Sequence, residues 1–117
     1  MTIIDAQLHE PALSRDHQDL DRDALFGLMV DVELAYMDAV GVDKAVLFPI
    51  DHEWGPWACA AVPERFTYVP MLRPPGVLGG LDVTDPALPE QLTRWTEDPA
   101  CVAVRMMHTL PGHLFEH

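Results

Sequence analysis

The sequence is poor in basic residues and lacks long apolar runs, and each shortage excludes a class of protein. Seven Lys and Arg residues stand against nineteen Asp and Glu, so the formal net charge is −12. A surface this acidic repels phosphate backbones, so we expect no nucleic-acid partner, and solubility is the simplest interpretation of the charge. No run of about 18 uncharged apolar residues is present, so we expect no membrane span and no membrane partner.

Two further absences bear on where the protein resides in the cell and on whether it forms disulfide bonds. The N-terminus lacks the basic and apolar regions of a secretory signal, which favours a cytoplasmic protein. The two cysteines, Cys59 and Cys101, have no metal-type spacing and are too few for a disulfide framework, so we interpret both as small buried hydrophobic residues. With 117 residues, the chain is predicted to be one domain, 1–117. It is well short of the ~250 residues of a typical eight-stranded α/β barrel.

The first informative stretch is Thr2 to Glu10, TIIDAQLHE, which begins with β-branched residues. It spaces Asp5, Gln7 and His9 two residues apart, so an extended backbone points these three side chains to one side and the apolar residues between them to the other. A polar row that gathers at the C-terminal end of a strand suits the first strand of a parallel barrel. The solvated face of an edge strand is the other interpretation of the same pattern.

Further along, strand-like and helical segments alternate. Apolar residues at helical spacing predict a helix over 24–40, with Gly41 as its stop and Asp21 or Asp23 as its cap. These apolar residues are Leu25, Leu28, Met29, Val32, Ala35 and Ala39. Further strands are predicted over 44–50, 66–72 and 101–107, further helices over 57–62 and 86–96, and an irregular loop over 73–85. Four parallel strands and three helices form either a small open sheet or half of a barrel.

Four segments carry a resemblance to a known family: IIDAQLH at 3–9, MDAVGVDKAVL at 37–47, PERF at 63–66 and VAVRM at 102–106. On these segments, which span nearly the whole chain in the expected order, it resembles the N-terminal half of the amidohydrolase-2 (amidohydrolase-related) family of metal-dependent hydrolases. The resemblance implies an α/β fold that is a partial (β/α)8 TIM barrel. It also implies a site at the C-terminal ends of the strands, where the first strand supplies two metal ligands as His-x-His.

The chain departs from that pattern in three ways. Gln7 stands at the first ligand position and His9 at the second, and a Gln carbonyl oxygen is a poorer zinc ligand than an imidazole nitrogen. The one lysine, Lys44, begins the predicted second strand, so it cannot supply the carboxylated lysine of the family's binuclear members. The family's later histidines and aspartate lie beyond residue 117. The resemblance therefore implies a divalent metal, zinc first, at His9, with further ligands from elsewhere.

Candidate site residues follow from these placements. His9 is the candidate metal ligand, with an interior hydrogen-bonded histidine as the alternative. Gln7 is a candidate for orienting a substrate carboxylate or carbonyl, or else satisfies a buried network. An inward Arg105 can clamp a carboxylate or pair with Asp5 across the barrel. His108 follows the same strand end and is a candidate substrate-binding residue.

The loop after the second predicted strand carries His52, Trp54 and Trp57. His52 is placed much as His108 is, and we treat it as a further candidate for the mouth of the site. The two tryptophans are predicted to line a lip or to pack beneath the loop, and packing is the simpler assumption.

The expected function is hydrolysis of a lactone, amide or related carbonyl, or decarboxylation, in a small carboxylated metabolite. It needs further barrel strands from the rest of the chain or from a partner. The alternative is a non-catalytic half-barrel subunit that acts by assembling with another chain, because an isolated half exposes strand edges that favour pairing. A homo-oligomer is one form of such an assembly.

Overall fold

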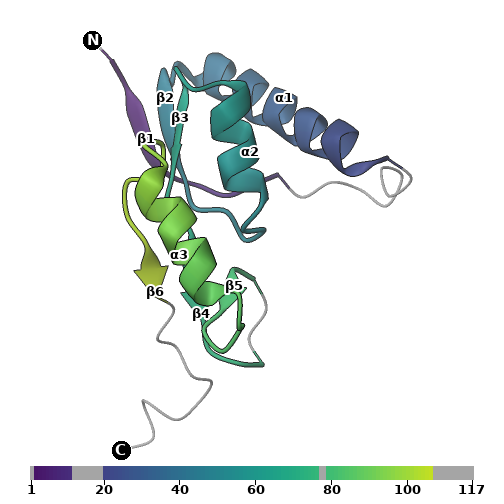
Figure 1. The fold of residues 1–117 in the computed structure, drawn as a ribbon. Coiled ribbons are helices and arrows are strands. Elements are labelled where there is room, and N and C mark those ends of the chain that lie inside the picture. Colours follow the sequence, from purple (N-terminus) through teal and green to yellow (C-terminus); the bar gives the residue numbers. More distant parts are fainter. Residues whose placement is uncertain (1, 12–19, 77–78, 107–117) are drawn as a thin grey trace, which may run out of the picture.

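The computed structural model describes residues 2–11, 20–76 and 79–106 and, for residues 6 and 7, the backbone alone. Strands and helices alternate along the chain much as predicted (Figure 1). In order, the elements are β1 (Ile4–Leu8), α1 (Arg22–Val40), β2 (Lys44–Leu47), α2 (Trp54–Ala61), β3 (Phe66–Tyr68), β4 (Met71–Arg73), β5 (Leu81–Asp82), α3 (Leu88–Glu97) and β6 (Arg105–Met106).

The strands form two parallel sheets. One has the order β1-β2-β3 and the other the order β5-β4-β6, and every pairing within them is parallel. The described residues therefore form a small α/β fold of three helices and two three-stranded parallel sheets. They do not form one four-stranded sheet and do not close a barrel. The arrangement therefore does not show the partial TIM barrel that the resemblance implies.

The predicted strand over 66–72 is divided into β3 and β4. Pro70 lies between them, and a proline has no backbone N–H to donate to a sheet ladder. The predicted strand over 101–107 is also divided, into an isolated parallel bridge between Cys101 and Tyr68 and the short β6. The bridge and β6 lie along consecutive parts of the segment that contains β3 and β4. Cys101 pairs with Tyr68 of β3, and the N–H of Arg105 donates to the carbonyl of Pro70 just before β4.

The expectation of an irregular loop over 73–85 was wrong at two places, because Arg73 is the last residue of β4 and β5 lies inside the range. Leu81 and Asp82 pair with Leu72 and Arg73 of β4. A strand of two residues is too short to show a period of two in the sequence. The glycines before it allow a close approach: a Cβ at Gly80, where φ is +69°, would collide with the carbonyl oxygen of Met71.

Both ends of α1 match the predicted signals. Asp21 is the N-cap, and its Oδ1 accepts a hydrogen bond of 2.8 Å from the N–H of Ala24. Gly41 ends the helix in the left-handed region with φ 77°.

The buried face of α1 is only partly the predicted one: Met29 is buried and Leu25 packs against the core, as expected. Val32, Ala35 and Ala39 were expected on the inner stripe, yet all three are exposed. The residues that are buried are Phe26, Met29, Val30, Glu33 and Met37. The predicted stripe omitted the rest of this face, on which a carboxylate, Glu33, occupies one position.

The core lies between the first sheet and the two helices that cover it. Figure 1 shows α1 and α2 side by side on one flank of β1, β2 and β3. Ala45, Leu47, Phe66 and Tyr68 face these helices and are each at most 2% exposed. Trp54, at the start of α2, is fully buried, which confirms the expectation that it packs.

α3 carries Pro89 in its first turn, where proline is well tolerated, and buries Trp95.

Cys59 is buried as predicted, whereas Cys101, at the isolated bridge with Tyr68, is only half-buried. Among the described residues, no helix is both long and apolar enough to cross a bilayer.

Candidate functional site

His9 and Phe48 lie where β1 and β2 end, at the end of the sheet away from the N-terminus (Figure 1). The Nδ1 atom of His9 is 2.6 Å from the carbonyl oxygen of Phe48. A carbonyl oxygen can only accept, so Nδ1 carries the proton in this contact and donates it. The Nε2 atom then presents its lone pair, which is the arrangement found in histidines that bind metals or accept protons.

Arg105 reaches the same residue from β6. Its guanidinium carbon lies 5.6 Å from the centre of the Phe48 ring, and its Nη2 is 3.1 Å from the sulfur of Met71. A thioether is a weak acceptor and Arg105 is exposed, so the guanidinium retains donors for a carboxylate. Two residues that the sequence singled out thus contact Phe48: His9 contacts its backbone carbonyl, and Arg105 lies over its ring.

Glu10 fixes the loop that follows β2. Its carboxylate accepts hydrogen bonds from the N–H of Ile50, at 2.8 Å and 3.0 Å, and from the N–H of Asp51, at 3.1 Å. Burial raises the pKa of Glu10, although these backbone hydrogen bonds oppose the rise. The sequence analysis did not select Glu10, although its position directly after His9 could have indicated that it lies near the site.

Asp5 lies on the opposite face of β1 from the one expected to carry the site. In a parallel pair, side chains at the same level share a face. Asp5 pairs with Ala45 and Leu8 pairs with Leu47, and the register shifts between these two pairs. Since Ala45 and Leu47 are both buried under the helices, Asp5 and Leu8 share that side. The shift breaks the regular alternation that the sequence predicted.

Glu33 of α1 is the one charged residue that is buried in the described part of the chain, at 7% exposure. Its Oε2 atom has no hydrogen-bond partner there. Burial raises its pKa to about 6, and the charges of Asp5 and Glu10 add to the rise, while His9 opposes it. The charges of residues in and just after β1 therefore act on Glu33. Apolar periodicity alone could not have identified this buried carboxylate.

The fit to a metal is partial. His9 presents one suitably oriented nitrogen, but no group of three His, Cys, Asp or Glu side chains able to hold a metal ion is found in the residues that the structure describes. The side chain of Gln7 and the whole of His108 lie outside those residues. The described side chains do not assemble a zinc centre by themselves, so we derive no reaction step through a metal.

In comparisons with protein-family models, with curated proteins and with solved structures, nothing matches this chain. Any assignment of function therefore rests on the geometry around Phe48.

Proposed function

We propose that the chain is an amidohydrolase-like protein of the cytoplasm. It would act on a lactone, amide or related carbonyl, or on a carboxylate to be removed, in a small carboxylated metabolite. One observation carries the proposal: His9 contacts the backbone carbonyl of Phe48, and the guanidinium of Arg105 lies over the Phe48 ring. An imidazole and a guanidinium that contact the same residue are suited to chemistry on a carboxylated substrate.

The two residues take different roles. Arg105 holds the substrate carboxylate through paired N–H donors. His9 acts through Nε2, as a ligand to a divalent ion such as zinc or as an acceptor of a proton. Zinc chemistry needs ligands beyond the described residues, on further barrel strands of the same polypeptide or of a partner chain. Gln7 and His108 remain our candidates for contacts to the substrate.

Metal content and activity together test the proposal. Purified protein is analysed for bound metal and assayed on a panel of lactones and amides of small carboxylic acids, alongside His9→Ala and the control Lys44→Ala, at an exposed position where β2 begins. We expect His9→Ala to lose activity and any bound metal, while Lys44→Ala keeps both. Equal behaviour of the two variants, with the fold intact by circular dichroism, would contradict the proposed role of His9.

The exposed apolar side chains at the open strand edges favour a second function, that of a non-catalytic half-barrel subunit. Ile4 of β1 is 59% exposed, and Val102, Val104 and Met106 at the other edge are 55%, 42% and 45% exposed. Among the described residues, no further strand lies beside these two edges, so both present apolar surface that favours pairing with another chain. A homo-oligomer is the simplest such assembly.

Sedimentation of the purified protein at micromolar concentration tests this second function. We expect an oligomer that Val104→Lys weakens, because the substitution places a charge on the open edge. The exposed Tyr36 of α1 supplies the control Tyr36→Lys, which lies on a helix away from the strand edges and should leave the assembly unchanged. A stable monomer would rule out self-assembly as the mode of action.

A further inference from the structure

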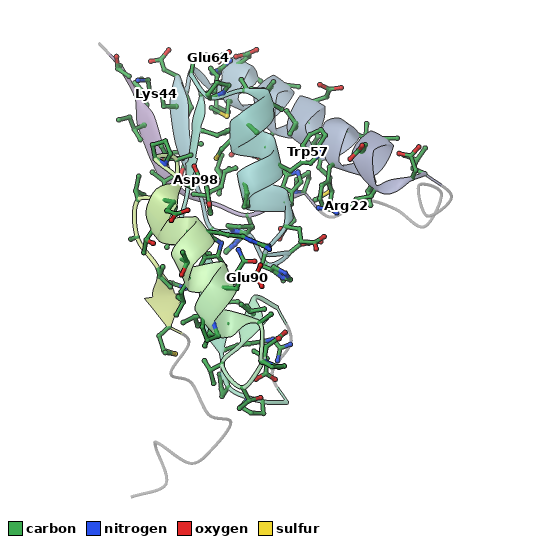
Figure 2. The ribbon with its side chains drawn as sticks, in the orientation of Figure 1. Arg22, Lys44, Trp57, Glu64, Glu90 and Asp98 are labelled. Atoms are coloured by element: carbon green, nitrogen blue, oxygen red, sulfur yellow. The ribbon has the colours of Figure 1, made fainter. Side chains whose placement is uncertain are left out.

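Two sides of α1 are covered by other elements of the fold. Met29 and Met37 are buried on the side toward the sheet. Trp57 of α2 covers a second side, because its ring meets that of Phe26 edge-on at 5.8 Å and its Nε1 donates to Asp23 at 3.2 Å. Figure 2 shows Trp57 on the part of α2 that is nearer α1. The remaining side of α1 is turned away from both the sheet and α2.

Apolar side chains follow this remaining side at helical spacing. We call them the outer stripe of α1: Leu28, Val32, Ala35, Tyr36 and Ala39. Positions 28, 32, 35 and 39 are separated by steps of four and three, with position 36 beside them, so they share one face of the helix. Leu28 is half-buried and the other four are exposed, Val32 by 40% and Tyr36 by 54%. Single apolar residues are ordinary on a surface, but a row of them along one helix face forms a patch.

The outer stripe reverses the usual pattern of a surface helix, which buries apolar residues and exposes charged ones. In α1 the charged Glu33 is buried at 7% exposure, whereas the neighbouring Val32 is 40% exposed. Removing apolar area from water is favourable, so a partner that covers the outer stripe gains binding free energy from it.

The spacing and size of the outer stripe match a second helix. Side chains at steps of three and four form ridges that pack into the grooves of another helix, whereas a strand has a period of two. Ala35 and Ala39 are small, so side chains of a partner can approach the backbone of α1 between them and Val32. The stripe runs for about three helical turns, which is enough for a short helix to lie along it.

Acidic residues border the outer stripe on one side. Asp31 and Asp38 are both exposed, and each directly precedes a stripe residue, so they lie in line along the helix. Arg65 balances part of the charge of Asp38, at 2.9 Å, which makes Asp31 the principal acidic group of this border. Arg22 is the one basic residue of α1, and it pairs with Glu53 at the first turn. The border therefore selects Lys or Arg on a partner.

We propose that the outer stripe of α1 binds an amphipathic helix of a partner protein that carries Lys or Arg beside its apolar face. The apolar side chains of that helix cover Val32 and Tyr36, and a basic side chain pairs with Asp31. A second copy of this chain fits less well, because two antiparallel α1 helices related by a two-fold axis would set their acidic borders against each other. The inference is independent of the proposed function, since neither His9 nor Arg105 takes part in it.

Two designed peptides of three heptads each serve as probes. Both carry Leu at the two apolar positions of every heptad, and the flanking positions are Lys in one peptide and Glu in the other. Fluorescence anisotropy of each labelled peptide is recorded while the purified protein is added. We expect the Lys peptide to bind saturably and the Glu peptide to bind at least about tenfold more weakly. Val32→Lys should weaken binding of the Lys peptide at least about tenfold, because it places a charge in the middle of the apolar stripe.

Charge reversal at the border sharpens the test. Asp31→Lys should weaken binding of the Lys peptide and strengthen that of the Glu peptide. Glu97→Lys is the matched control, because it makes the same change in charge at an exposed position of α3, which does not lie beside α1 (Figure 1). It should leave both affinities unchanged. Tyr36→Lys should weaken binding of the Lys peptide while leaving an assembly through the strand edges intact, which separates the two surfaces.

Three results would overturn the proposal once circular dichroism shows that the variants are folded. The first is the lack of saturable binding of the Lys peptide. The second is an equal loss of affinity in Glu97→Lys and Asp31→Lys, which would reduce the effect to net charge. The third is an oligomer that Val32→Lys dissociates in sedimentation, which would assign the outer stripe to a second copy of the chain.

Discussion

The middle of the first sheet and the margins of the two sheets differ in burial and in the chemistry they carry. In β2 and β3, Leu47 and Tyr68 are at most 1% exposed beneath α1 and α2. At the margins, Ile4 of β1 and Met106 of β6 are 59% and 45% exposed, and these strands carry or precede His9 and Arg105. We therefore expect the buried middle of the sheet to contribute most of the free energy of unfolding, whereas the candidate functional residues His9 and Arg105 belong to the edges. Variants of the two regions should therefore separate stability from function.

The largest expected effect is that of Trp54→Ala. Trp54 is fully buried at the start of α2, and removing the ring leaves a cavity and takes away the hydrogen bond from the indole N–H to the carbonyl of Phe26. We expect a loss of about 3–5 kcal/mol in the free energy of unfolding, measured by urea denaturation. Trp57→Ala is the control: Trp57 is only half-buried, and its loss should cost clearly less. Equal losses would contradict the difference in burial between the two tryptophans.

Glycines of the two covering helices give a sharper contrast of opposite sign. A Cβ at Gly55 of α2 would lie 2.8 Å from Cγ of Pro49 and 3.3 Å from Cβ of Tyr68, so Gly55→Ala should destabilise by about 1–3 kcal/mol. A Cβ at Gly27 of α1 would find only Trp57, at 3.7 Å. Gly27→Ala should therefore stabilise by about 0.5–1 kcal/mol, because alanine is the better helix former.

Thermal melts of the two alanine variants measure this contrast. A neutral Gly55→Ala would show that α2 can move away from Pro49 and Tyr68, and the close packing of helix on sheet would then be looser than the distances indicate.

Glu33→Gln should stabilise the protein in a pH-dependent way. Because the pKa of Glu33 is raised to about 6 in the folded state, folding is penalised whenever the carboxyl is ionised. The penalty is complete above the folded pKa and absent below the unfolded value near 4.5, which corresponds to about 2 kcal/mol at pH 8. Urea denaturation at pH 8 and pH 4.5 should show the variant more stable only at the higher pH.

Glu64→Gln, a change at an exposed position after α2, controls for the loss of one negative charge. If both glutamine variants gained the same stability at pH 8, the gain would come from the net charge and not from burial of Glu33.

The sequence predicted those features that depend on local chemistry. Asp21 and Gly41 fix the ends of α1 through hydrogen bonds within a few residues, so their effect can be recognised without any tertiary structure. The parallel order of the strands followed from the alternation of strand and helix. The sequence also predicted His9 at the end of the first strand and Arg105 within the last one, although their contacts with Phe48 depend on the pairing of strands remote in sequence.

The features that were missed depend on contacts between distant segments. The register shift in β1 arises from pairing with β2, and it decides which face Asp5 occupies. The burial of Glu33 arises from the way α1 lies against the sheet, which overrides the apolar pattern of the helix.

The smallest expected effect on stability is at the margin itself, with Arg105→Gln. The guanidinium contacts the Phe48 ring and the Met71 sulfur while exposed to solvent, so its removal should change the free energy of unfolding by less than about 1 kcal/mol. If Arg105 holds the substrate carboxylate, the same change should raise KM about tenfold or more, since a bidentate charged pair is lost. Denaturation and steady-state assays of one preparation measure both quantities. A large loss of stability would instead give Arg105 a structural role and remove the contrast between the middle of the sheet and its edges.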